Sequence, residues 1–419
     1  MSALAVSAPP FNSPSPQPVR RRWPPAIWAL LAIIFAVRAG GFVYPYLSYR
    51  LDGLHMASAS AGTVLAAFGL GWLAGQVLCG WLADRIGRRT TLVAAMLLAA
   101  AVFPLLAQVH TASALTGAAV VAGLVYDAPR PIASALVSDE IDDEEDRTRI
   151  TGWRHFATNV GAATTGAVGG ALAGPVGIAF LFWVNGAVCA VVAVVALRVL
   201  PSSRPADATI HRGSHRGAIT DVRLWVLWLA SLLTLIPVAA LCSTLPLMMA
   251  RDQLPAAAYG WTQIASAGAV LALSPLLNPV LARRAARPAP MVGPLALSAL
   301  VLGAGIGMAG IASTTIGYSA AAVLAVPGEI IAFVAATDIV NRISPADARA
   351  TYAGIWGTTL AAAIMCAPLL AGWSLAHGGT QLAAWTTFAC GVLGAAVCLP
   401  LAALVKPPPA QHPAPLAAP

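Results

Sequence analysis

Charged residues are scarce in this sequence. Asp, Glu, Lys and Arg together make up 10% of the 419 residues, whereas hydrophobic residues make up 58% and the mean hydropathy is +0.78. Soluble domains contain about 25% charged residues, so the composition excludes an ordinary soluble protein. The continuous apolar runs also exclude a membrane barrel, whose strands alternate in segments of about 10 residues. The sequence therefore predicts an all-α integral membrane protein.

The patterns of metal, disulfide and nucleotide sites are also absent. The six cysteines have no paired spacing and no accompanying histidines, which argues against a disulfide framework or a metal centre. The phosphate-binding loop G-x-x-x-x-G-K-[ST] does not occur, which argues against ATP-driven transport by this chain alone. We therefore expect a protein that is not an enzyme and that carries no cofactor.

Apolar runs separated by polar, glycine or proline residues indicate twelve transmembrane helices, since a helix needs roughly 20 apolar residues to cross the hydrocarbon layer. We divide the chain into an N-terminal six-helix half at 25–200 and a C-terminal six-helix half at 224–405, joined by a cytoplasmic linker at 201–223. The Pro-rich termini, 1–24 and 406–419, are expected to be disordered, and neither looks like a cleaved signal peptide. The predicted spans are centred near residues 37, 71, 100, 125, 163, 188, 236, 270, 300, 327, 363 and 392.

Basic residues fall on one side of the predicted membrane. If the arginines at 20–22 are cytoplasmic, the alternating loops place most other basic residues inside and leave only Arg50 and Arg251 outside. This is the positive-inside pattern, so we expect both termini to be cytoplasmic and the protein to lie in the cytoplasmic membrane. The topology explains the net charge of +8 without a nucleic-acid partner. The expected partners are lipid, protons and a small-molecule substrate, and the chain is expected to act as a monomer.

The chain contains a weak internal repeat. An offset of 198 aligns Gly62 with Gly260 and the loop at 84–89 with 282–287, and an offset of 202 continues the match further along. The repeat predicts two six-helix halves in parallel orientation. Transporters of this kind bind their substrate between the halves, near the middle of the bilayer.

Four charges are concentrated in GWLADRIGRRT, residues 80–90, between the second and third predicted spans. This stretch resembles the cytoplasmic loop signature of the major facilitator superfamily, G-x-L-a-D-r-x-G-r-R. Two later stretches, RHFATNVGAATTGAVGG and PGEIIAFVAATDIVNRISPADARATYAG, are similar to drug:proton antiporter-like members of that family. The resemblance implies transport by alternating access. The residues that match the loop signature are Gly80, Leu82, Asp84, Arg85, Gly87, Arg88 and Arg89.

The resemblance also implies a gate at the cytoplasmic end of the second span. Asp84 would interact there with the start of the eleventh span, near Arg349 and Gly354, because a helix N-terminus stabilises a carboxylate. Arg88, one turn further on, would pair with Asp84 and with Asp139. These contacts would close the cytoplasmic side in the outward-facing state and break when it opens. The alternative is that these charges only fix the topology.

Other charges near the cytoplasmic ends have simpler interpretations. Arg89 is explained by topology alone. Asp338, near the end of the tenth span, is expected to act as a secondary gate or as a helix-end charge. The acidic run DEIDDEED at 139–146 lacks the spacing and glycine of a cation-binding loop, so we expect a solvated face balanced by nearby arginines.

Four charged residues fall inside the predicted spans: Arg38, Asp127, Arg130 and Glu329. Each costs at least ~2.5–3.5 kcal/mol at the bilayer centre unless it is paired or hydrated, so each is a candidate for a role in the transport cavity. The offset of 202 aligns Asp127 with Glu329, which gives each half one acid at an equivalent position. Asp127 and Arg130 are three residues apart on one predicted helix. The alternative to a cavity role is therefore that these two side chains simply neutralise each other. The expected partner of Arg38 is Asp127 or Glu329.

Glu329 has no basic neighbour on its own predicted helix. A carboxyl group whose surroundings change during alternating access can take up a proton on one side of the membrane and release it on the other. Glu329 is therefore the first candidate for the proton-coupling site and Asp127 the second, with the proton gradient as the expected energy source.

The fifth predicted span departs from the antiporter pattern. Drug antiporters often carry G-x-x-x-G-P-x-x-G-G there, whereas this chain has Thr165-Gly166 in place of Gly-Pro. The missing proline weakens the efflux assignment and leaves the fold unaffected. The small and polar residues of this span are expected to allow close helix packing; they are Asn159, Gly161, Gly166, Gly169 and Gly170.

These observations favour a secondary active transporter that exports a small organic compound, a drug or a metabolite, by proton-coupled alternating access. The alternative is a proton symporter or facilitator that imports a small metabolite. A membrane receptor ranks third, because it would need an extra soluble domain or a long loop. Several aromatic residues are candidates for the cavity wall, although membrane interfaces also favour such residues; they are Tyr44, Tyr46, Trp72, Trp183, Trp261 and Trp356.

Overall fold

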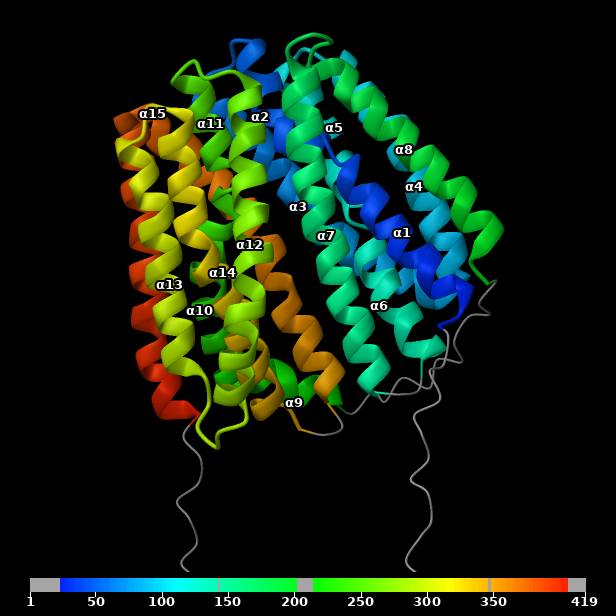
Figure 1. Ribbon diagram of the computed structural model, residues 1–419, viewed down its shortest axis with the longest axis vertical. Helices are drawn as coiled ribbons and strands as arrows, with labels where there is room; N and C mark the ends of the chain where they lie inside the picture. Colours follow the sequence, from blue (N-terminus) through cyan, green and yellow to red (C-terminus); the bar gives the residue numbers. More distant parts are fainter. Residues whose placement is uncertain (1–22, 142–143, 202–213, 346–347, 406–419) are drawn as a thin grey trace, which may run out of the picture.

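The structure is a computed structural model that describes residues 23–141, 144–201, 214–345 and 348–405. Every regular element within these ranges is a helix, and the helices stand side by side in a bundle (Figure 1). A helix satisfies its backbone hydrogen bonds internally, which is the requirement that hydrocarbon imposes on a chain that crosses it. The predicted all-α fold class is confirmed.

The N-terminal half contains eight helices. Its short elements arise where a span is interrupted, at 40–42 between α1 and α2 and at 127–128 between α5 and α6. The elements are α1 (Pro25–Ala39), α2 (Val43–Gly53), α3 (Ser58–Ile86), α4 (Arg88–Gln108), α5 (Ala112–Tyr126), α6 (Pro129–Glu140), α7 (Glu144–Ala173) and α8 (Ile178–Val199).

The predicted linker contains the short helix α9, and the C-terminal half that follows repeats the interruption of its first span, between α10 and α11. The elements are α9 (Ser214–Thr220), α10 (Val222–Ala240), α11 (Thr244–Arg251), α12 (Ala256–Ala285), α13 (Val292–Gly307), the 3-10 helix η1 (Met308–Ile311), α14 (Thr315–Ile343) and α15 (Arg349–Leu404).

The helices form the twelve spans that the sequence predicts. Within the described residues, nine helical segments are long and apolar enough to cross a membrane. One of them, Thr351–Leu404, contains two spans, because the backbone is non-helical at Gly378 and Gly379. The pair α5–α6 and the helix α7, whose first turns are charged, complete the set. Each predicted span centre lies within one of these helices.

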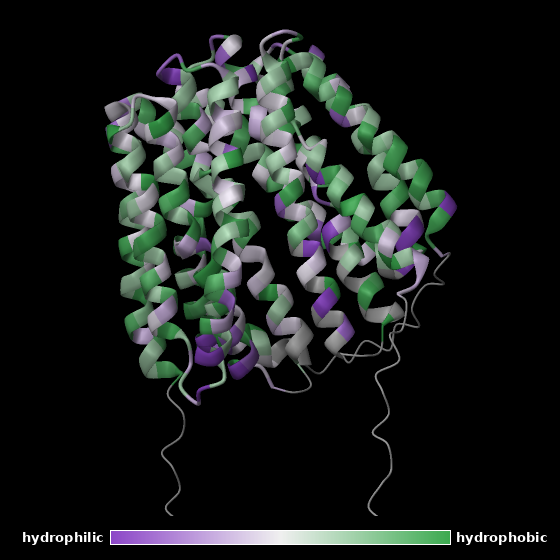
Figure 2. Cartoon of the chain, in the orientation of Figure 1, coloured by the Kyte–Doolittle hydropathy of each residue, from purple (hydrophilic) through white to green (hydrophobic). Residues whose placement is uncertain are grey.

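Hydropathy follows the bundle geometry. Long apolar stretches cover most of each helix, and hydrophilic residues gather near the helix ends and at a few positions inside the bundle (Figure 2). Large apolar side chains are exposed on outward faces, among them Val77, Val191 and Leu399. These side chains would contact lipid, which explains why the protein can leave them uncovered.

The two halves meet through two equivalent helix crossings. On α3 and α15, a Cβ added to Gly62 would lie 2.5 Å from the Pro368 carbonyl oxygen and 2.9 Å from Gly372 Cα. On α12 and α7, a Cβ added to Gly260 would lie 2.4 Å from the Gly166 carbonyl oxygen and 2.9 Å from Gly170 Cα. The offset that aligns Gly62 with Gly260 therefore relates two contacts of the same geometry. Only glycine permits such close approach of two backbones.

These crossings lie toward one end of the bundle. We call the end where α1 begins and α15 ends the terminal side, and the opposite end, where the α2–α3 and α11–α12 turns lie, the distal side (Figure 1). Further along the same helices toward the terminal side, a Cβ added to Gly80, Gly354 or Gly357 would meet no described atom within 4 Å. The described residues thus show the halves in close contact on the distal side and more open space around these three glycines toward the terminal side.

The first helix turn of the second half carries a capping carboxylate outside the membrane-spanning segment. Asp221 accepts hydrogen bonds from the Arg223 backbone N–H at 2.9 Å, the Arg223 Nη2 at 2.8 Å and the Tyr352 hydroxyl at 2.7 Å. Burial alone would raise the pKa of Asp221, but these hydrogen bonds outweigh it and hold the pKa below its ordinary value. Asp221 thus joins the start of α10 to α15.

Candidate functional site

A cavity of about 170 Å³ lies between the two halves. The N-terminal half contributes charged and aromatic residues, and the C-terminal half contributes mainly apolar residues with a thiol, a phenol and an amide. From the first half come Arg38, Tyr44, Tyr46, Trp72, Tyr126 and Arg130, and from the second come Val238, Cys242, Tyr259, Gln263, Leu360 and Ile364. A cavity walled by both halves is the expected position of a transport site.

Arg38 occupies the last turn of α1, next to the interruption before α2. Its carbonyl oxygen accepts hydrogen bonds from the Gly41 N–H at 3.2 Å and from the Thr165 hydroxyl on α7. A Cβ added to Gly161 would lie 2.6 Å from Arg38 Cβ, so glycine at that position lets α7 pass close to α1. These contacts hold the backbone of Arg38 where its side chain lines the cavity.

Asp127 lies at the interruption between α5 and α6 and is 7% exposed. Its Oδ2 is 2.7 Å from Arg130 Nε and its Oδ1 is 3.6 Å from Arg38 Nη2. The ion pair within the fourth span forms despite Pro129 and Pro131, because the helix restarts at Pro129 and brings Arg130 back toward the carboxylate. Of the two partners expected for Arg38, the structure places Asp127 beside it. One carboxylate thus faces two guanidinium groups at the cavity.

Glu329 lies midway along α14 and has a different environment from Asp127. Its carboxylate makes no hydrogen bond and no ion pair with any residue that the structure describes. The Cys242 thiol, which lines the cavity, lies within electrostatic range of both Glu329 and Arg38. The two acids that the repeat aligns are therefore unequal, since Asp127 is paired with arginines and Glu329 is not.

Aromatic rings form the wall next to these charges. The Tyr44 and Trp72 rings are 5.7 Å apart, the Trp72 and Tyr126 rings 5.2 Å, and the Tyr44 and Tyr126 rings 6.1 Å, with tilted or edge-on geometry. The Tyr126 hydroxyl donates to the Gly41 carbonyl oxygen at 3.1 Å, which ties this wall to the break in the first span.

The six predicted cavity aromatics divide into two groups. Tyr44, Tyr46 and Trp72 line the cavity. The other three do not line this cavity: Trp183 and Trp261 are exposed, at 50% and 63%, as the alternative of a membrane interface expects, and Trp356 donates to Ser231. Four further wall residues with polar groups were not predicted from the sequence: Tyr126, Cys242, Tyr259 and Gln263. Of these four residues, only Tyr126 could have been predicted from the sequence, because it is next to Asp127.

The glycines of the fifth span lie at contacts between helices. Gly166 and Gly170 face Gly260 across the crossing of α7 and α12. A Cβ added to Gly169 would lie 2.4 Å from the Tyr46 ring, and the Tyr46 hydroxyl donates to the Gly166 carbonyl oxygen at 3.1 Å. Asn159, on the same helix, is partly buried and has an interaction partner. The Gly166 position that replaces the antiporter proline thus contacts the other half directly.

The loop signature joins α3 to α4 on the terminal side. Gly87 has φ of 91°, a backbone conformation that favours glycine, and this residue ends α3 and caps α4. The Arg85 guanidinium carbon lies 4.3 Å from the Trp81 ring centroid, and Arg89 donates to the Leu200 carbonyl oxygen at 3.3 Å. Arg88 is partly buried and has an interaction partner. Leu82 is partly buried on α3.

Three residues of the predicted gate lie outside the described side chains: Asp84, Asp139 and Arg349. The pairing expected between the second and eleventh spans therefore stays a prediction. Gly80 and Gly354, the glycines on either side of that pairing, both face open space.

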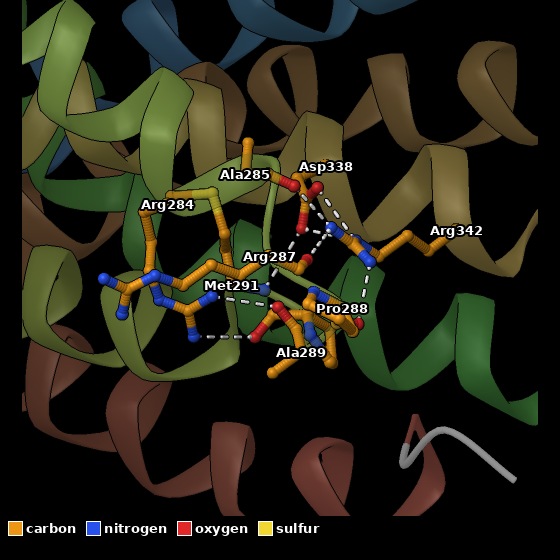
Figure 3. A network of polar contacts seen from close by, with 9 residues as sticks. Arg284, Ala285, Arg287, Pro288, Ala289, Met291, Asp338 and Arg342 are labelled. Carbon is orange, nitrogen blue, oxygen red and sulfur yellow. Dashed lines mark hydrogen bonds and ion pairs between the residues drawn. The ribbon is translucent and has the colours of Figure 1, made fainter. Parts of the chain in front are cut away.

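Asp338 is engaged entirely within the C-terminal half (Figure 3). Its Oδ2 accepts a hydrogen bond from the Met291 N–H at 3.1 Å, and both carboxylate oxygens lie 2.9 Å from Arg342 Nε. Arg342 also donates to three carbonyl oxygens of the α12–α13 loop, those of Ala285, Arg287 and Pro288. Of the two roles expected for Asp338, this geometry is that of a helix-end charge, because the carboxylate caps the start of α13.

The acidic run is described only in part. Asp146 accepts a hydrogen bond from Trp23 Nε1 at 3.2 Å and lies 4.0 Å from Arg149 Nη1. The other carboxylates, Asp139 to Glu145, lie outside the described side chains. Among the residues that were described, no cluster of three or more His, Cys, Asp or Glu side chains has the geometry to hold a metal ion.

Solved structures of similar architecture include two kinds of transporter. The chain is similar to a peptide transporter POT solved in complex with sulfate, with 14% identity, a TM-score of 0.71, and coverage of 92% of this chain and 96% of that one. It is also similar to a mutant of the nucleoside transporter NupG, with 15% identity, a TM-score of 0.67, and coverage of 91% and 100%. At this identity the likeness shows the fold alone, and no curated protein matches the chain.

The family follows from a broader match. A model of the major facilitator superfamily matches residues 27–326, which include the loop signature, Asp127, and the crossing of α7 and α12. With the twelve helices and the cavity between two halves, this match shows that the chain is a membrane transporter of the major facilitator superfamily.

Proposed function

We propose that this chain moves a small organic compound across the cytoplasmic membrane by alternating access, and that protons drive the movement. The observation that carries the proposal is a cavity with charged and aromatic walls between two halves whose described glycine crossings lie on the distal side. A binding site that is open to one side of the membrane at a time is what alternating access requires.

The described conformation corresponds to the inward-facing state if the termini are cytoplasmic. The glycine crossings close the distal side, and glycines of the same helices face open space toward the terminal side. In the opposite state the terminal side would close, and Asp84 and Arg88 would meet the start of α15 near Arg349 and Gly354. The gate contacts and the glycine crossings would therefore alternate.

Glu329 is the proposed proton carrier. A carboxyl group inside the membrane that lacks a cationic partner is costly in its ionised form, which favours proton uptake when water and protons reach it. Its proximity to Cys242 places it near the wall of the cavity. Asp127 is the weaker candidate, because its carboxylate already faces two arginines, at 2.7 Å from Arg130 and 3.6 Å from Arg38.

The direction of transport has two candidate answers. Resemblance to drug:proton antiporters favours proton-coupled efflux, and this stays the first proposal. The alternative, import together with a proton, is favoured by the charge of the wall: among the described residues, Arg38 and Arg130 line the cavity, and Asp127 lies between them. The two arginines of such a site repel cationic substrates, which are the substrates that compete with protons for a carboxylate in an antiporter.

Reconstituted vesicles test the proposal. The purified chain would be placed in liposomes with a trapped pH dye, and compounds that shift its thermal stability would be added outside. Export by antiport predicts that an added compound enters as protons leave, so the interior becomes alkaline. Symport predicts that the interior becomes acidic. A compound that the protein exchanges without any proton movement would contradict proton coupling.

A further inference from the structure

We propose that the cavity recognises a small aromatic monoanion, whose carboxylate or sulfonate is held by Arg38 and whose ring packs against Tyr44, Trp72 and Tyr126. This inference deepens the proposed function and rests on it only in taking the cavity as the transport site. The chemistry follows from the charge, the hydrogen-bonding capacity, the size and the walls of the cavity.

Two guanidinium groups, of Arg38 and Arg130, are among the described residues that line the cavity. The Asp127 carboxylate lies 2.7 Å from Arg130 Nε but 3.6 Å from Arg38 Nη2, so it is engaged more closely with Arg130 than with Arg38. An anionic ligand would give Arg38 a closer charged partner than Asp127 provides.

Arg38 has the hydrogen-bonding capacity to hold that ligand. A guanidinium group carries five N–H donors in a planar fork. The Arg38 side chain makes no hydrogen bond to a described residue, and its contact with Asp127, at 3.6 Å, is longer than a hydrogen bond. Planar oxyanions match this fork in a bidentate manner, so a carboxylate or sulfonate is the complementary group.

The size and walls of the cavity favour one aromatic ring. An apolar cavity of about 150 Å³ accommodates benzene in another protein, and this cavity measures about 170 Å³. The Tyr44, Trp72 and Tyr126 rings lie 5.2 to 6.1 Å from one another and line the cavity together with Arg38. Leu360 and Ile364 of α15, in the other half, add apolar surface to the same cavity. A ring packed on these surfaces would place its anionic group within reach of Arg38.

Equilibrium binding to the purified full-length chain tests the inference. The probes are benzoate, its neutral analogue benzamide and its cationic analogue benzylamine, measured by calorimetry and by quenching of tryptophan fluorescence. We expect benzoate to bind saturably, benzamide to bind about tenfold or more weakly, and benzylamine to bind weakest. Binding of benzylamine as tight as that of benzoate would overturn the inference, and this comparison needs no mutant.

Variants then locate the anion. Arg38→Gln is expected to weaken benzoate binding by about tenfold or more while benzamide binding stays unchanged. Arg38→Lys keeps the charge without the planar fork, so it is expected to fall between the wild type and Arg38→Gln. The matched control is Arg284→Gln, because Arg284 lies at the end of α12 and donates only to the Ala289 and Pro290 carbonyl oxygens. Equal benzoate affinity in Arg38→Gln and Arg284→Gln would overturn the inference.

Transport of benzenesulfonate separates this inference from the proposed function. This anion stays charged, so it does not cross the lipid as benzoic acid does. If it binds but is neither exchanged nor accompanied by protons, the proposed function fails and the assignment of the site stands. If another compound drives proton movement while benzoate and benzenesulfonate do not bind, the assignment fails and the proposed function stands.

Discussion

Adding one methyl group at the crossing of α7 and α12 should shift the protein toward the state that is open on the distal side. In Gly260→Ala the new Cβ would lie 2.4 Å from the Gly166 carbonyl oxygen, whereas ordinary contacts begin at 3.4 Å. The two backbones must therefore separate by about 1 Å. Overpacking of this kind costs about 1–3 kcal/mol. The cost applies only to the state in which the crossing is closed. The ratio of distally open to distally closed protein should therefore rise about 5- to 150-fold.

A second glycine on the same helix provides the matched control. A Cβ added to Gly268 meets no described atom within 4 Å, so Gly268→Ala has the same effect on helix propensity without the collision. The assay is the distribution of distances between spin labels at His55 and Ile316, exposed positions of the two halves near the distal side. The wild type and Gly268→Ala should share one short-distance population, and Gly260→Ala should add a longer one.

Two results would refute this reasoning. If Gly260→Ala and Gly268→Ala give the same distance distribution, the crossing is not part of a gate. If Gly260→Ala unfolds the protein while the distal distance stays short in the folded fraction, the crossing serves only stability.

Three further predictions concern the terminal side and its loops. Asp84→Asn or Arg88→Ala should leave the protein folded but slow its transport greatly, and unchanged turnover in vesicles at equal protein amount would contradict the gate. Asp338→Ala should lower the free energy of unfolding by about 1.5–3 kcal/mol, measured by denaturant or thermal melting, because the Met291 N–H and Arg342 lose a charged acceptor. The pKa of Asp221 is below its ordinary value, so its contribution to stability is present above about pH 4 and is lost as the pH falls through that lowered pKa; Asp221→Asn should remove this part of the acid dependence of melting.

Much of the fold was predictable because lipid imposes a simple rule on sequence. Apolar length alone located the twelve spans, since each must cross the same hydrocarbon layer. The repeat also pointed to Gly62 and Gly260, although no local pattern explained why these positions are glycine. The reason is a crossing with a helix of the opposite half, and the partners, Gly372 and Gly170, lie too far along the chain to be found from local pattern.

The site was predictable only where a charge stood out against an apolar background. Arg38, Asp127 and Arg130 were conspicuous for this reason, and the structure brings them together. Cys242 and Gln263 were not, because a thiol or an amide within a span has no distinctive cost or spacing. The interruption of the fourth span at Asp127 was not predicted either, since Asp127 and Arg130 were expected on one helix, whereas α5 ends at Tyr126 and α6 begins at Pro129.

The alignment of Asp127 with Glu329 shows what an internal repeat can and cannot predict. Equivalent sequence positions place both acids at the same depth in their halves. Their surroundings differ, because the arginines that pair with Asp127 belong to the first half, and the second half has no basic residue on α14 near Glu329. Position follows from the repeat, whereas electrostatic environment depends on the neighbours.

Glu329→Gln tests the central claim, that proton movement through this site drives transport, because it removes the titration while keeping size and hydrogen-bonding capacity. The measurement is substrate flux in liposomes with and without an imposed pH difference, with internal pH followed by a trapped dye. The account predicts that the Gln variant still exchanges substrate down its own gradient but no longer accumulates it when a pH difference is imposed. Accumulation equal to that of the wild type would contradict the account and leave Glu329 as a structural acid.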